Sequence, residues 1–212
     1  MGDYLMPAKN GTHEMIVEKS RFICHVYRVM TTHEATMYIN EIRETHKRAN
    51  HHCVAYLIGE DNNEFGRADD DGEPSGTAGS PMLEVLKRQN VRNCLVIVTR
   101  YFGGVKLGAG GLIRAYGSSV SAGLSSVGLV WRVKMRSVWL RFDYAILATL
   151  KGKLQRRGYM VGRVTYTDQV ELEVLVEVVD TQKFIKWIVE LTNNAATVEI
   201  GEISFKERPY DH

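Results

Sequence analysis

The sequence predicts an α+β protein made of two domains, with boundaries at 1–132 and 133–212. Three observations lead to this prediction. The first part contains a continuous apolar run at 94–98, which indicates a central strand covered on both faces. A glycine-rich segment at 99–117 follows that run, and after Trp131 the sequence changes to regular alternation of apolar and polar positions. With 212 residues, of which 44% are hydrophobic, the chain is long enough to form two small cores.

Local signals place the helices and strands of the first domain. Strands are expected over three stretches: 15–17, 22–27 and 51–59. Thr31 and Glu34 have the spacing of a capping box and predict that a helix starts after Thr31. A polar loop follows the third strand. Ser80 and Pro81 are expected to start the next helix, because the hydroxyl can cap free amides and proline loses no hydrogen bond there.

The second domain shows strand and helix signals in the order βαββαβ. A half-buried strand is expected at 139–144, and the helix that follows is expected to end at Gly158. Two strands come next, the second of which alternates between apolar and mostly acidic residues over 169–178. Thr181 can cap the second helix, and 198–205 completes the sheet. This order is that of the ferredoxin-like fold, which many unrelated functions share.

The charged residues are unevenly distributed, although the net charge is only +2. Acids predominate between Glu60 and Glu84, whereas no acid occurs from there to Asp143. The bases in that acid-free interval are Lys87, Arg88, Arg92, Arg100, Lys106, Arg114, Arg132, Lys134, Arg136 and Arg141. Such a segment creates positive potential that attracts polyanions, so RNA is an expected partner, without DNA specificity. The alternative is that the acidic stretch folds back and neutralises it.

Composition argues against several functional classes. The three cysteines, Cys24, Cys53 and Cys94, are isolated among apolar neighbours, which is typical of buried thiols in a reducing compartment. No stretch approaches the ~20 apolar residues that a membrane span requires, and the N-terminal residues do not resemble a secretion signal. The expected location is therefore the cytoplasm, and no cofactor, metal or membrane partner is expected.

The glycine-rich segment is the first candidate site. Glycine lets the backbone approach a ligand closely, and unpaired amides at the start of the following helix favour anions. We expect phosphate to bind here, with Tyr101 or Phe102 available to stack on a base. The candidate contact residues are Lys19, Arg21, Arg100, Tyr101, Gly103, Gly104, Lys106, Gly108, Gly110, Gly111 and Arg114. The segment matches neither a P-loop nor the dinucleotide motif, and in the alternative interpretation its glycines serve only turns and helix packing.

The acidic segment at 69–79 is the second candidate site. Its carboxylates can hold a hard cation or act as acid and base, and its hydroxyls can donate to a phosphate. The residues concerned are Asp70, Asp71, Glu73, Ser75 and Thr77. Acids in a glycine-rich loop are more often solvated or paired with nearby bases, so no metal site and no catalytic residue is assigned.

Three separated motifs occur in order within residues 15–130. They are Lys19-Ser20-Arg21-Phe22-Ile23, the segment from Asp70 to Gly79, and the segment from Thr99 to Gly117. Together they closely resemble the motifs of the IMPACT family, including its bacterial members of the YigZ type. The resemblance implies an N-terminal α/β domain of the ribosomal-protein type and a C-terminal domain similar to the last domain of elongation factor G. Eukaryotic members regulate translation through an extra N-terminal domain that is not expected here, so that mechanism is not transferred.

Three hypotheses about function remain open, of which we favour the first. It is a translation-associated regulator that binds RNA or the ribosome, with a protein partner in translation as a further expectation, and it predicts salt-sensitive association. The second is an enzyme that acts on a phosphorylated or anionic small molecule, which predicts that the acidic and glycine-rich segments face one pocket. The third is a protein-interaction module in which the solvent face of the C-terminal sheet binds a partner.

Overall fold

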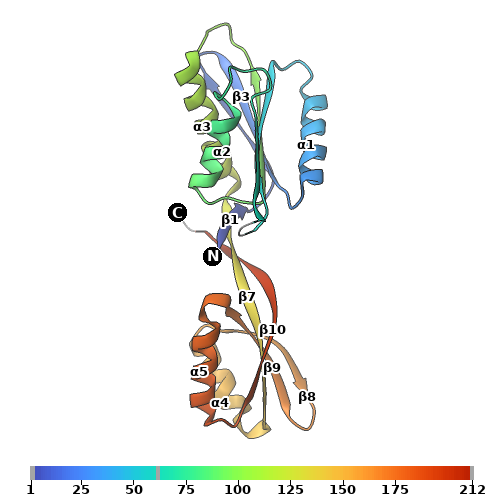
Figure 1. The fold of residues 1–212 in the computed structure, drawn as a ribbon, viewed down its shortest axis with the longest axis vertical. Helices are drawn as coiled ribbons and strands as arrows, with labels where there is room; N and C mark the ends of the chain where they lie inside the picture. Colours follow the sequence, from blue (N-terminus) through green and yellow to red (C-terminus); the bar gives the residue numbers. More distant parts are fainter. Residues whose placement is uncertain (1–2, 61–62, 211–212) are drawn as a thin grey trace. The chain divides into compact units, whose positions relative to one another are not determined.

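The protein, represented by a computed structural model that describes residues 3–60 and 63–210, has an α+β fold with antiparallel sheets. The chain divides into two compact units (Figure 1). The first comprises the chain up to Arg132 together with the segment that starts at Arg208, and the second comprises Val133–Glu207. The α+β class and the two-domain organisation predicted from the sequence are confirmed. No helix among the described residues is long and apolar enough to cross a membrane.

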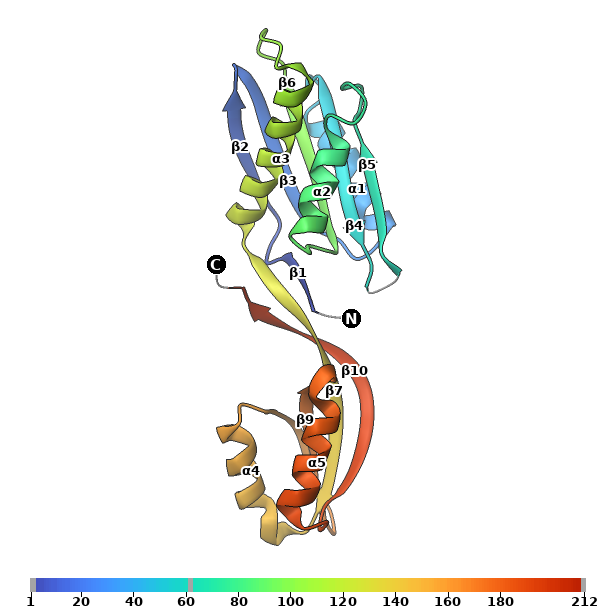
Figure 2. The same ribbon diagram turned by 60° about the vertical axis from the view of Figure 1, so that its left-hand side comes forward.

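A five-stranded antiparallel sheet forms the centre of the first unit. Its spatial order is β2 (Gly11–Val17), β3 (Ser20–Arg28), β6 (Cys94–Tyr101), β4 (His51–Ile58) and β5 (Phe65–Asp69). Three helices pack on it: α1 (Thr32–Thr45), α2 (Gly79–Arg88) and α3 (Gly108–Val127). Figure 2 shows α2 and α3 together on one face of the sheet and α1 on the other. A short strand, β1 (Tyr4–Pro7), pairs with residues 129–132.

The central strand β6 contributes to a hydrophobic core on each face of the sheet. Cys94, Val96 and Val98 belong to the core under α2 and α3, whereas Leu95 and Ile97 belong to the core under α1. Successive side chains of a strand point to opposite faces, so a strand covered on both faces must be apolar throughout. The apolar run in the sequence is therefore explained by burial on both sides.

Two local features of the first unit differ in detail from the sequence signals. The polar stretch after β4 was expected to be a loop throughout, but it contains β5, whose residues are mostly exposed and which pairs with β4. The capping box that starts α1 is present: Thr31 Oγ1 accepts from the Glu34 amide at 3.2 Å. The Glu34 carboxylate accepts from the Met30 amide, one residue earlier than a standard box requires.

The second unit has the predicted βαββαβ order. Its elements are β7 (Leu129–Phe142), which begins in the first unit, α4 (Leu147–Arg156), β8 (Met160–Tyr166), β9 (Val170–Glu177), α5 (Thr181–Thr192) and β10 (Thr197–Pro209). The spatial order of the strands is β10-β7-β9-β8, with antiparallel pairing of β9 to both neighbours. This is the ferredoxin-like arrangement, with α4 and α5 on one face of the sheet (Figure 1).

Candidate nucleic-acid interface

The turn between β2 and β3 presents two charged residues. Val17 and Ser20 pair across the hairpin, so Glu18 and Lys19 are the central residues of the turn, with φ angles of 45° and 63°. Two-residue hairpin turns require this left-handed conformation, which glycine or asparagine usually supplies. A carboxylate and an ammonium group therefore stand where the backbone conformation is unfavourable for their residue types.

The glycine-rich segment packs directly against this turn. A Cβ atom at Gly103 would lie 2.0 Å from the carbonyl carbon and oxygen of Lys19, so a larger residue does not fit there. The Gly103 amide also donates a hydrogen bond of 3.2 Å to the Ser20 hydroxyl. The close approach of two backbone segments explains why this position is glycine.

A buried ion pair connects the glycine-rich and acidic segments. The side chains of Arg100 and Glu73 are only 6% and 4% exposed, and the arginine Nη1 donates to the glutamate Oε1 over 2.6 Å. The Tyr116 hydroxyl donates to the same carboxylate oxygen over 2.7 Å, and Arg100 Nη2 donates to the Ser20 hydroxyl over 3.3 Å. The expectation that Arg100 contacts phosphate does not hold, because its charge is buried and paired inside the first unit.

Asp70 caps the helix α2 instead of forming an open acidic site. Its carboxylate accepts hydrogen bonds from the amides of Gly76, Ala78 and Gly79, at 2.7, 3.0 and 2.8 Å. Burial acts to raise the pKa of Asp70, but these amide bonds outweigh it and hold the pKa below its usual value. The Ala78 and Gly79 amides at the start of α2 are thus satisfied by a residue eight and nine positions earlier in the chain, and the expected cap at Ser80 is not used.

The other polar residues of the acidic segment are also engaged in the fold or exposed. Asp71 forms an ion pair of 3.0 Å with Arg43 and accepts from the His52 amide at 2.6 Å. Thr77 donates to a backbone carbonyl of its own loop, and Ser75 is exposed. Within the described ranges, no group of three His, Cys, Asp or Glu side chains is placed to hold a metal ion. These contacts agree with the alternative interpretation of the segment, in which its acidic side chains pair with nearby groups.

Three cationic side chains of the candidate set are accessible to a ligand. Lys19, Lys106 and Arg114 are exposed, and none of them forms an ion pair with another residue in the part of the chain that the structure describes. Lys19 stands on the β2–β3 turn, Lys106 precedes α3, and Arg114 lies in the second turn of that helix. Because Gly103 joins the turn to the glycine-rich segment, these three positive charges belong to one region of the first unit.

Arg21 and Tyr101, two further members of the candidate set, contact each other and also interact with neighbouring residues. Arg21 forms a bidentate ion pair with Glu14, with both N–O distances 2.7 Å. The Arg21 guanidinium also lies 5.6 Å from the centre of the Tyr101 ring, whose hydroxyl is 2.9 Å from His46 Nδ1. These side chains are accessible, but their charge and hydrogen-bonding capacity are partly satisfied. Phe102 is 46% exposed and is the more accessible ring of the segment.

In the part of the chain that the structure describes, the start of α3 lacks a side-chain cap like the one that Asp70 gives α2. Its N-cap residue Leu107 makes no side-chain hydrogen bond, and no acid occurs in the first turn. Gly104 and Gly108 have positive φ angles of 84° and 68°, which accounts for two glycines of the candidate set. A Cβ atom at Gly111 would lie 3.0 Å from the Leu107 side chain, and one at Gly110 would lie 3.6 Å from the Arg114 guanidinium. The segment thus forms an uncapped helix start with cations beside it.

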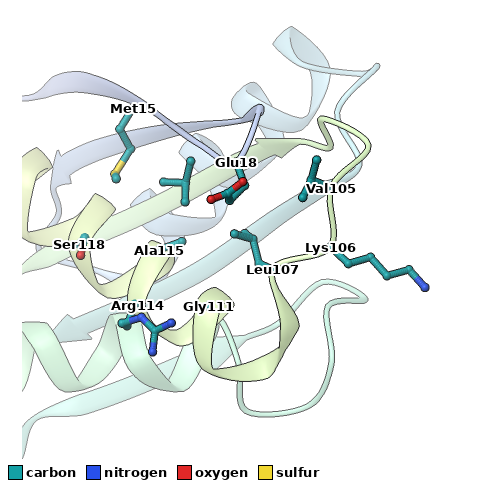
Figure 3. Close-up of a pocket in the computed structure, with 10 residues that line it drawn as sticks. Met15, Glu18, Val105, Lys106, Leu107, Gly111, Arg114, Ala115 and Ser118 are labelled. Atoms are coloured by element: carbon teal, nitrogen blue, oxygen red, sulfur yellow. The ribbon is translucent and has the colours of Figure 1, made fainter.

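A cleft of about 410 Å³ lies between the β2–β3 hairpin and α3. Its apolar lining is Met15, Val17, Val105, Leu107 and Ala115, and its polar lining is Glu18, Lys106, Arg114 and Ser118, with Gly111 beside them. Figure 3 shows Met15 and Glu18 on one side, Ala115, Ser118 and Arg114 on the helix side, and the Lys106 side chain extended away. None of the acidic-segment residues lines this cleft, so the two segments do not face one pocket here.

Sequence reasoning missed Glu18 as a member of this region. The sequence prediction rested on positive charge, and Glu18 carries the opposite charge. The signal that identifies it is positional: two charged residues, Glu18 and Lys19, separate two strand patterns, so both must occupy the hairpin tip.

Comparison with known proteins identifies relatives along nearly the whole chain. Residues 18–124 match the Impact N-terminal domain, and residues 140–195 match a domain of unknown function, DUF1949. The IMPACT family member YvyE of Bacillus subtilis is 46% identical over 209 residues, which cover 99% of this chain and 96% of that protein. The family member YigZ of Escherichia coli is 34% identical over 170 residues, 79% of this chain and 81% of YigZ. A crystal structure described as a hypothetical protein has a TM-score of 0.60 at 30% identity, covering 95% of this chain and 98% of that one.

Proposed function

This chain belongs to the IMPACT family, and we propose that it is a translation-associated regulator that binds RNA in the cytoplasm. The translational role rests on the family. RNA binding rests on one observation: Lys19, Lys106 and Arg114 are exposed around the uncapped start of α3, without ion-pair partners among residues 3–60 and 63–210. Cations that the protein does not neutralise are available to phosphate groups.

The contacts expected from this arrangement are mainly with the RNA backbone. Lysine and arginine side chains bind phosphate oxygens and position the strand without reading its sequence. The free amides at the start of α3 add partial positive charge at the same place. Phe102 is half exposed and can stack on an unpaired base, which favours a single strand over a duplex.

The acidic segment supports this assignment indirectly. Asp70 and Glu73 are held by backbone amides and by Arg100, so they do not place free negative charge next to the three cations. The same contacts leave these two carboxylates without a free role as acid, base or metal ligand. RNA binding therefore fits the geometry better than an enzyme that uses this loop.

The experiment is a salt series of RNA binding. We would measure anisotropy of a labelled single-stranded RNA and sedimentation with ribosomes for the wild type and for the variant Lys19→Ala/Lys106→Ala/Arg114→Ala. Loss of three phosphate contacts on a single strand should reduce the log–log salt slope by about 2. Arg100 is left intact because its removal would unpair a buried carboxylate.

The matched control removes three positive charges elsewhere. Lys151, Lys153 and Arg156 on α4 make no ion pairs within the described residues, so their replacement by alanine changes the net charge equally. This control should retain the wild-type slope. Equal losses in both variants would mean that only the net charge matters, and the absence of salt-dependent binding by the wild type would refute the proposal.

A further inference from the structure

The cleft beside α3 combines charges of both signs that do not neutralise each other. Glu18, Lys106 and Arg114 all line it, yet none of the three forms an ion pair with any residue that the structure describes. Figure 3 shows Glu18 across the cleft from Arg114. A ligand that fits these charges must offer hydrogen-bond donors to the carboxylate at one end and an anionic group to the cation at the other.

Apart from Ser118 and Gly111, the remaining lining of the cleft is apolar. Leu107, Ala115 and Met15 provide a surface without hydrogen-bonding groups in their side chains, apart from the thioether. A volume of about 410 Å³ falls within the range of small-ligand sites. A nucleotide meets all three requirements, because its base is flat and apolar on its faces, its edge carries donors and its phosphate is anionic.

The carboxylate discriminates among the four bases. An ionised glutamate offers only acceptors, so it binds best to an edge that carries two adjacent donors. Guanine presents N1–H and N2–H side by side on its Watson–Crick edge. Adenine and cytosine each present one donor next to an acceptor, and uracil presents one donor between two acceptors. We propose that the cleft binds an unpaired guanine base of the RNA, with its Watson–Crick edge on Glu18 and its phosphate toward Arg114.

The hairpin fixes the backbone position of Glu18. Its φ of 45° is fixed by the hairpin pairing of Val17 with Ser20, and the turn is packed against Gly103. The backbone of such a turn has less freedom than that of a flexible loop, so less backbone entropy is lost when the base binds. This inference rests on the proposed RNA binding and adds the identity of the base.

The test compares two RNAs and two proteins. The probes are a short labelled oligouridylate with one central guanosine and the same strand with adenosine in its place. The wild type should bind the guanosine strand at least about fivefold more tightly, the lower range for one bidentate base contact. Glu18→Gln should abolish this preference, because the amide keeps one acceptor and places donors against the donors of guanine.

A control separates the site from the net charge. Glu41→Gln, on α1 at the opposite face of the sheet, removes the same charge and should keep the preference for guanosine. Equal affinity of the wild type for the two strands, or an unchanged preference in Glu18→Gln, would overturn the inference while leaving RNA binding intact.

A second measurement applies if no RNA binds at all. Saturation-transfer NMR with guanosine 5′-monophosphate and adenosine 5′-monophosphate then tests the cleft by itself. Binding of the guanine nucleotide alone, lost in Glu18→Gln, supports the cleft assignment and refutes only the RNA function. If neither nucleotide binds, both the cleft assignment and the RNA function are refuted.

Discussion

Replacement of Glu73 by glutamine should destabilise the first unit by about 3–5 kcal/mol, the usual cost of breaking a buried ion pair. The substitution preserves size, and Tyr116 can still donate to the amide oxygen. What is lost is the negative charge that neutralises Arg100, whose side chain is only 6% exposed and whose Nε has no hydrogen-bond partner among the described residues. The stability is lost because a buried cation remains without a counter-charge.

The double variant Glu73→Leu/Arg100→Met separates this cost from the value of the pair itself. Glu73→Leu alone and Arg100→Met alone should each cost about 3–5 kcal/mol, since each leaves one buried charge without its partner. Removal of both charges should cost only about 1–3 kcal/mol, mainly because the Tyr116 hydroxyl loses its acceptor. The losses in unfolding free energy of the two single variants should therefore sum to several kcal/mol more than the loss in the double variant.

The assay is urea unfolding followed by the fluorescence of Trp131, which packs against the core of the first unit. Trp139→Phe and Trp187→Phe remove the tryptophans of the second unit, so the signal reports the first unit alone. Glu84→Gln is the control, because that glutamate is 59% exposed and its ion pair with Lys87 is on the surface. Its replacement should cost about 0.5 kcal/mol or less. A similar small loss for Glu73→Gln, or additive single effects, would refute the assignment of a buried pair.

Three further outcomes are expected. Asp70→Ala should lower the free energy of unfolding by about 1–2 kcal/mol in the same assay, because the Ala78 and Gly79 amides at the start of α2 and the Gly76 amide of the preceding loop lose their acceptor; Asp70→Asn should lose less. Gly103→Ala should cost about 2–3 kcal/mol and weaken RNA binding without any change of charge, because its Cβ would overlap the Lys19 carbonyl; unchanged anisotropy and stability would contradict this packing. Burial, with smaller effects of His46 and His52, lowers the pKa of His25 from 6.5 to about 4. The neutral form is favoured in the folded state, so stability is present in full above about pH 6.5 and falls as the pH drops toward 4, by about 1 kcal/mol per pH unit. Urea unfolding of His25→Gln across this range should show a smaller slope than the wild type.

Elements that bury an apolar face could be predicted from the sequence, whereas elements held mainly by backbone pairing could not. The run of apolar residues in β6 reports burial on both faces, and the spacing of Thr31 and Glu34 reports the start of α1. The strand β5 gives no such signal, because Phe65–Asp69 is mostly exposed and joins the sheet through hydrogen bonds of its main chain.

The candidate site was predicted less well because sequence does not reveal which charges are buried. Arg100 and Arg114 look alike in a basic segment, but one ends a central strand and the other lies on the exposed side of a helix. Only the fold brings Glu73 to Arg100, across 27 positions of the chain. The open cations were found by composition, and Glu18 was not, since its significance depends on the cleft that the hairpin forms with α3.

The acidic segment and the glycine-rich segment look like separate sites in the sequence, but in the structure they are joined by one set of contacts. Glu73 holds Arg100 from the acidic segment, Arg100 reaches Ser20, and Ser20 accepts from the Gly103 amide, so a single buried chain of contacts fixes the β2–β3 turn against the glycine-rich segment. Glu18 lies on that turn but outside the chain of contacts. Substitutions should therefore affect stability and base preference separately. Changes at Glu73 should alter both unfolding and RNA binding. Glu18→Gln should alter the preference for guanine and leave the unfolding midpoint unchanged.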